Sequence, residues 1–196
     1  MKKLYVLGLA SALAAAGCAT HVNKPETTEN PAPAVRFNEY SKFELKPINE
    51  GRGCEKQHGG DKLLDSVNER LQKQLGKTLD SWEQSAEAKR AKRGTLVIEP
   101  VCSDAKLVGT TARIFLGPMM GSSAVVLSVR YTEARSGKLI AEPVFYQRTA
   151  AMSGGFTFGA MDKNMLSRIV TLISDYTVNN YADLVGGRTG VEKEGG

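Results

Sequence analysis

The sequence predicts an α+β domain of order β-α-β-β-β-α, with two helices packed on one face of a mixed four-stranded sheet. In residues 61–89, apolar side chains recur every three or four positions, as on one face of a helix: Leu64, Val67, Leu71, Leu75, Leu79 and Trp82. This helix should continue to a stop at Gly94. A second stretch with helical spacing closes the domain and includes Met161, Met165, Ile169, Ile173 and Tyr176.

Four strands are expected around these helices. Residues 37–48 alternate between apolar and polar, and residues 95–101 are β-branched and apolar. Residues 124–132 and 138–149 should form a hairpin that turns at Gly137, where a positive φ is needed. A parallel arrangement of the first two strands would use a right-handed crossover through the first helix.

The first seventeen residues have the layout of a secretory signal peptide. Lys2 and Lys3 precede an apolar stretch, residues 4–16, which is too short to span a hydrocarbon core of about 30 Å. Residues 15–18 are Ala-Ala-Gly-Cys and resemble a bacterial lipobox, whose cysteine is acylated and becomes the N-terminus. Cys18 is therefore the predicted lipidation site. Ala15 stands where such motifs usually have leucine, so cleavage after an ordinary Ala-x-Ala site is the alternative.

The residues that follow indicate a location and a domain organisation. In lipoproteins of the kind that this segment resembles, aspartate after the cysteine is associated with retention in the inner membrane. Ala19 therefore favours the outer membrane, with the domain in the periplasm.

Residues 18–36 are polar and rich in proline, which predicts an extended tether. We expect one domain over residues 37–185 and a flexible tail over residues 186–196.

The composition argues against nucleic acid as a partner. Hydrophobic residues make up 41% and charged residues 24%, as in ordinary globular proteins. Loss of Lys2 and Lys3 with the signal peptide would lower the formal net charge from +5 to +3. The basic cluster at residues 89–93 lacks the interleaved aromatic side chains of a groove for single strands.

Cys54 and Cys102 remain once Cys18 is used for lipid. An isolated pair in an oxidising compartment is expected to form a disulfide, and parallel first strands would bring both cysteines within reach. Redox catalysis is the alternative, but the sequence has no Cys-x-x-Cys. A metal site at Cys54 and His58 would lack a second pair of ligands, so no metal is expected.

No catalytic arrangement is recognisable in the sequence. A Gly-x-Ser-x-Gly elbow is missing, and the two histidines, His21 and His58, offer no credible triad base. Residues 117–121 lack the Gly-Lys-Ser/Thr ending of a phosphate loop. Glu99 and Glu142 are a weak candidate pair for glycoside hydrolysis. We expect a protein without enzymatic activity and without a cofactor.

Two glycine-flanked loops carry large apolar side chains. Antiparallel pairing should bring residues 109–123, residues 153–159 and the disulfide to one end of the sheet, with the tether at the other end. These side chains either fold back over the core or form a contact patch for a protein partner. They are Phe115, Leu116, Met119, Met120, Phe156 and Phe158.

Several segments together resemble a known family. Residues 95–101, the loop 117–121, the run 125–129 followed by Ser-Gly-Lys at 136–138, and the closing helix resemble an uncharacterised family of proteobacterial outer-membrane lipoproteins. The resemblance covers most of residues 95–182. Related sheets look like the N-terminal domain of the periplasmic protein TolB, which implies a binding or assembly role.

The expected function is therefore that of an envelope lipoprotein that binds or scaffolds a periplasmic or outer-membrane protein. Two alternatives stay open. One is a module that binds a small molecule or a polysaccharide, as an accessory to export. The other is a hydrolase with an unfamiliar site.

Overall fold

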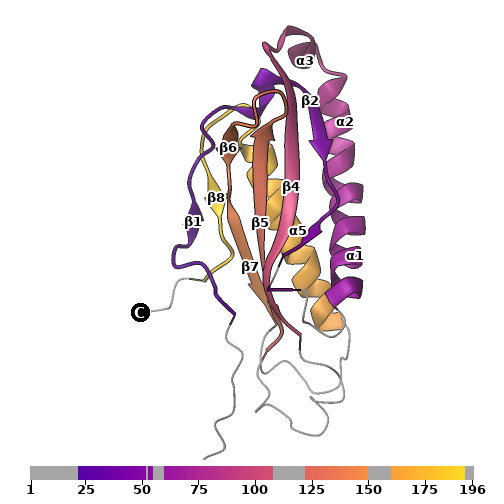
Figure 1. Ribbon diagram of the computed structural model, residues 1–196, viewed down its shortest axis with the longest axis vertical. Helices are drawn as coiled ribbons and strands as arrows, with labels where there is room; N and C mark the ends of the chain where they lie inside the picture. Colours follow the sequence, from indigo (N-terminus) through magenta and orange to yellow (C-terminus); the bar gives the residue numbers. More distant parts are fainter. Residues whose placement is uncertain (1–21, 52, 55–59, 108–121, 150–159, 193–196) are drawn as a thin grey trace, which may run out of the picture.

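The computed structural model describes residues 22–51, 53–54, 60–107, 122–149 and 160–192 of the 196-residue chain. Within them, helices pack on one face of a tall mixed sheet, and a two-stranded ribbon lies beside the edge strand of that sheet (Figure 1). No helix in these ranges is both long enough and apolar enough to cross a membrane.

The described residues place six strands in the main sheet. The order is β2-β4-β5-β6, with β3 paired to β4 and β7 paired to β5. β2 and β3 run parallel to β4, and the other pairs are antiparallel. The strands are β2 (Tyr40–Leu45), β3 (Asn49–Glu50), β4 (Arg93–Lys106), β5 (Ala124–Glu133), β6 (Leu139–Ala141) and β7 (Val144–Arg148).

The predicted α+β class is confirmed, but the prediction of four strands is wrong. Prolines account for the difference, because a proline has no N–H to donate to a neighbouring strand. Pro47 separates β2 from β3, and Pro143 separates β6 from β7. Residues 138–149, expected as one strand, are therefore the two strands β6 and β7. Residues 37–48, also expected as one strand, contain a 3₁₀ turn at Phe37–Glu39 and the strand β2, and the short strand β3 follows them.

The first helical region is also divided more finely than expected. α1 (Gly60–Leu71) continues through a π-helical turn, Gln72–Gly76, into α2 (Lys77–Glu83). α3 (Ala86–Arg90) is a separate helix, because the extended backbone of Ser85 interrupts the path and its hydroxyl accepts the amide of Ala88 at 3.1 Å. The helix therefore ends well before Gly94, and β4 has already begun at Arg93.

The core lies between the sheet and α1, α2 and α5 (Ala160–Asn179). At its centre Phe37 stacks on Tyr131, with ring centroids 4.9 Å apart, and Tyr176 packs against both rings. The hydroxyl of Tyr131 lies 2.7 Å from that of Thr177. Since the Thr177 hydroxyl donates to the carbonyl of Ile173, it accepts the proton of Tyr131.

Parts of the expected tether and tail belong to the fold. β1 (Glu29–Asn30) pairs antiparallel with β8 (Gly187–Arg188). The side chain of Asn30 exchanges two hydrogen bonds with the backbone of Val144, and the amide of Tyr146 donates to the carbonyl of Thr189. This ribbon satisfies the edge of β7, which would otherwise expose unpaired backbone groups.

Candidate functional site

Several of the predicted site residues lie outside the described residues. The predicted lipidation site Cys18 is one of them, and so is His58. The six apolar side chains of the two predicted partner loops also lie outside, so the choice between core plug and contact patch stays open: Phe115, Leu116, Met119, Met120, Phe156 and Phe158.

Cys54 and Cys102, the pair that the sequence predicts, form a disulfide bond. Their Cα atoms are 6.1 Å apart, and 48 positions separate them in the sequence. Gly51 and Gly53 allow the segment before Cys54 to lie against β4, because a Cβ at either position would come within 2.2 Å of a carbonyl oxygen of β4. The Gly-x-Gly-Cys spacing is a signal for this close approach that the sequence analysis missed.

The first described residues lie at the same end as the disulfide, although the chain reaches Phe37, where the predicted domain begins, at the opposite end, as expected. The backbone amide and the side-chain amide of Asn23 both donate to Asp104 Oδ2, at 2.9 and 3.2 Å. Asp104 follows Cys102 by two positions on β4. The last paired row of the described strands, Lys106–Ala124–Arg148, lies at this end of the sheet, which we call the anchor end.

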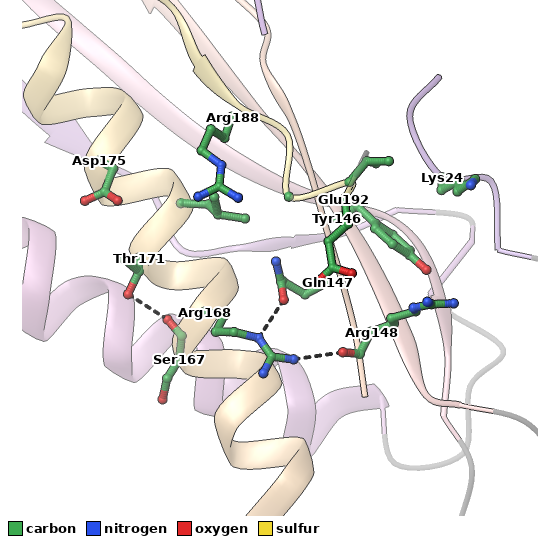
Figure 2. A pocket seen from close by; sticks show the side chains of 13 residues that line it. Lys24, Tyr146, Gln147, Arg148, Ser167, Arg168, Thr171, Asp175, Arg188 and Glu192 are labelled. Carbon is green, nitrogen blue, oxygen red and sulfur yellow. Dashed lines mark hydrogen bonds between the residues drawn. The ribbon is translucent and has the colours of Figure 1, made fainter. Parts of the chain in front are cut away.

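A groove of about 770 Å³ begins near the anchor end and runs between α5 and β7 (Figure 2). The C-terminal segment, residues 188–192, forms its third side, and Lys24 lies at its rim. Gly190 makes this arrangement possible: it has a φ of 86°, and a Cβ there would lie 2.3 Å from the carbonyl oxygen of Tyr146.

Arg168 lines this groove and links α5 to β7 through two hydrogen bonds. Its Nε donates to Gln147 Oε1 at 2.7 Å, and its Nη2 donates to the backbone carbonyl of Arg148 at 2.8 Å, as Figure 2 shows. These two bonds fix the plane of the guanidinium group.

Two other arginines in the groove are not held in this way. Within the described part of the chain, the guanidinium groups of Arg148 and Arg188 have neither an ion pair nor a hydrogen bond. Arg148 is exposed at the end of β7, and Arg188 is exposed on β8. Burial raises the pKa of the Tyr146 hydroxyl, and the nearby charge of Arg148 opposes that rise.

The charge of the lining side chains is biased toward positive. Four of them are cationic and two are acidic: Lys24, Arg148, Arg168 and Arg188 against Asp175 and Glu192. An arrangement of this kind suits a phosphate or carboxylate group, because guanidinium groups donate several parallel hydrogen bonds to such oxygens. The groove leaves no signal in the sequence, because its four cations come from four separate segments and show no local spacing.

The carboxylates weighed for glycoside hydrolysis each have a partner elsewhere. Glu99 accepts a hydrogen bond from Asn49 at 2.7 Å, and Glu142 pairs with Arg130 at 3.6 Å. In the described ranges, no three side chains of His, Cys, Asp or Glu gather as a metal site would need.

No family model and no curated protein matches the chain. Among solved structures, it is similar to the hypothetical protein CT253 from Chlamydia trachomatis (12% identity, 70% of this chain and 98% of that chain, TM-score 0.38). It is also similar to the PelC dodecamer from Paraburkholderia phytofirmans (12%, 73% and 93%, 0.37). A third structure is XCC0632 from Xanthomonas campestris, of family DUF330 (13%, 79% and 91%, 0.42). Likenesses this distant assign no family, and the resemblance to TolB stays a prediction.

Proposed function

We propose that this chain is a bacterial envelope lipoprotein without enzymatic activity, whose periplasmic domain binds or scaffolds another envelope protein. The proposal joins the lipobox-like run that ends at Cys18 to one structural observation, the bond between Cys54 and Cys102. Structural disulfides persist in oxidising compartments and are rare in the cytosol. The bond therefore supports export, which is the route that the signal-peptide layout predicts.

The apolar side chains at the end opposite the anchor end support a protein partner there. Val178, Leu184 and Val185 are 45%, 49% and 66% exposed, and they lie within one short stretch at the C-terminal end of α5. Within this stretch, Tyr181 stacks on Trp82 with ring centroids 4.0 Å apart. Clustered exposed apolar side chains of this kind commonly mark protein interfaces. An anchored domain would present this end away from the bilayer.

The test is affinity isolation of the full chain from detergent-solubilised envelope, compared with a Leu184→Glu/Val185→Glu variant. We expect one co-purifying envelope protein with the wild-type chain and its loss with the variant. Leu139→Glu is the matched control, since Leu139 is also 45% exposed but belongs to a different element, β6. Equal recovery of the partner with all three chains would contradict the interface.

The same experiment with Cys18→Ala examines the anchor. The proposal predicts that this variant leaves the membrane fraction and no longer recovers an outer-membrane partner. A variant that stays in the membrane fraction would contradict anchoring through Cys18.

A further inference from the structure

The residues before β1 lie on the surface of the domain and bury little of themselves. None of the side chains of residues 22–28 is buried, and those of Asn23, Glu26 and Thr27 are exposed. The burial changes abruptly at Asn30, which is 8% exposed and exchanges two hydrogen bonds with the backbone of Val144. We call residues 22–28 the strap.

The strap is attached near both of its ends. At one end, the two amide groups of Asn23 donate to Asp104 Oδ2, at 2.9 and 3.2 Å. At the other end, Thr189 donates from its amide to the carbonyl of Thr28 at 2.9 Å and from its hydroxyl to the carbonyl of Thr27 at 2.7 Å. Hydrogen bonds near the surface are replaced by bonds to water when they open, so each one contributes little to the attachment.

The chain beyond the strap is held more firmly. Asn30 belongs to β1, which lies beside β8 at the edge of the sheet (Figure 1). The hydroxyl of Tyr176 donates to the carbonyl of Pro31 at 3.0 Å, and the side chain of Phe37 is completely buried. Opening of the strap would therefore stop at β1 and leave the core intact.

The attached and the detached strap would place Cys18 at different distances from the domain. With the strap attached, residues 19–23 link Cys18 to the contact at Asp104, and they span at most about 18 Å. With the strap detached, the link extends to β1, and residues 19–29 span at most about 40 Å. The anchor end would then no longer be tied to the chain, so the domain could also rotate about β1.

From these observations we propose that the strap is a releasable latch, which gives the lipid-anchored domain a short and a long distance from the bilayer. The proposal deepens the proposed function and depends on it, because the two distances exist only for a domain anchored through Cys18. The detached state would bring the exposed stretch at Val178 and Leu184 to partners beyond the shorter reach. Binding of such a partner would favour release, because only the detached state makes that contact.

Hydrogen exchange of the protein isolated from the envelope in detergent tests whether the strap opens as one unit. Asp104→Ala should accelerate exchange at the Thr189 amide about three- to tenfold, although this amide bonds to Thr28 and not to Asp104. Thr189→Val, which removes the hydroxyl bonded to Thr27, should accelerate exchange at the Asn23 amide to a similar extent.

Two controls define the limits of the opening. Glu99→Ala removes a side-chain bond to Asn49 from the same strand as Asp104, and it should change neither amide. The amide of Tyr146, which donates to Thr189, should keep its exchange rate in all variants. Acceleration at Asn23 alone in Asp104→Ala would overturn the latch, because the two attachments would then open independently. Equal acceleration at Tyr146 would also overturn it, since the whole edge of β7 would then open.

Neutron reflectometry of the acylated protein on a supported bilayer measures the two distances. In Asp104→Ala/Thr189→Val, the protein layer should lie farther from the headgroups and be broader than in the wild-type chain. Glu99→Ala should give the wild-type profile. The same layer position for the double variant and the wild-type chain would overturn the proposed change of reach.

Failure of the anchor and failure of the latch give different results. If Cys18 carries no lipid while the amides of Asn23 and Thr189 open together, the proposed function is wrong although the strap opens as described. If Cys18 is acylated and the two amides open independently, the anchor stands and the latch is wrong.

Discussion

Asn23 and Asp104 lie 81 positions apart in the sequence, yet both amide groups of Asn23 donate to one carboxylate oxygen of Asp104. This contact brings the incoming chain to the end of the sheet that holds the Cys54–Cys102 bond. The distance between a lipid on Cys18 and the folded domain is thereby set by five residues, not by the eighteen-residue tether that the sequence suggests.

The first prediction concerns this contact. Asp104→Ala should accelerate hydrogen exchange at the Asn23 amide several-fold while changing the free energy of unfolding by less than about 1 kcal/mol, because the contact lies at an exposed site. Glu99→Ala is the control, since it removes a side-chain bond to Asn49 from the same strand. Unchanged exchange at Asn23 would mean that the chain is not held there.

The disulfide should contribute strongly to stability. Its 48-residue separation corresponds to about 4 kcal/mol in the chain-entropy model. Cys54→Ala/Cys102→Ala should therefore lose about this much free energy of unfolding in a denaturant titration. Adding a reductant should destabilise the wild-type chain and leave the double variant unaffected. A reductant effect of equal size on both chains would point to a cause other than this bond.

The buried tyrosines predict a loss of stability at alkaline pH. Burial raises the pKa of Tyr131, against a smaller lowering by the hydrogen bond to Thr177, and burial also raises the pKa of Tyr176. Above the ordinary tyrosine pKa of about 10, the unfolded chain releases protons that the folded chain keeps, so stability falls as pH rises. Below that pH both states are neutral, and the stability is fully retained.

Tyr131→Phe isolates this effect. At neutral pH the variant should be about 1 kcal/mol less stable, because it loses the hydrogen bond to Thr177. Between pH 10 and pH 12 its free energy of unfolding should fall less steeply than that of the wild-type chain. Parallel curves for the two chains would show that Tyr131 ionises as readily when folded as when unfolded.

Gly190 should be essential for the wall of the groove. Gly190→Ala would place a Cβ 2.3 Å from the Tyr146 oxygen and 2.6 Å from a methyl group of Leu172, at a φ of 86°. We expect a cost of about 3 kcal/mol and faster hydrogen exchange at the Tyr146 amide, which donates to Thr189.

Gly137→Ala is the control for Gly190→Ala. It separates the backbone strain of a positive φ from the steric clash of an added Cβ. Gly137 also has a positive φ, of 68°, but no atom lies within 4 Å of the added Cβ. Its substitution should cost only about 1 kcal/mol. Equal costs at the two positions would mean that the close approach at Gly190 contributes nothing.

Short-range sequence patterns correctly predicted a turn and the buried face of a helix. The turn at Gly137 has the expected positive φ, and Ile169 and Ile173 lie on the buried face of the closing helix. The parallel pairing of β2 with β4 is the arrangement under which the cysteines were expected to meet, and the bond between Cys54 and Cys102 confirms the predicted pair. The packing of the residues before Phe37 against the disulfide end could not be predicted, because it depends on isolated contacts such as that of Asn23 with Asp104.

The β1–β8 ribbon and the groove depend on residues far apart in the sequence. A strand of two residues has no periodicity to detect, and Asn30 pairs with Gly187 across most of the chain. The groove is lined by Lys24, Arg148 and Arg188 together with other residues, and it forms only when the ribbon covers the edge of β7. Their proximity follows from tertiary packing, which no sequence spacing records.

Intact-mass spectrometry of the protein isolated from the cell envelope without reductant tests the central claim most directly. The account predicts a chain that lacks residues 1–17, carries acyl groups on Cys18 and is two hydrogens lighter for the Cys54–Cys102 bond. A chain that retains residues 1–17, with three free thiols, would contradict export and anchoring together.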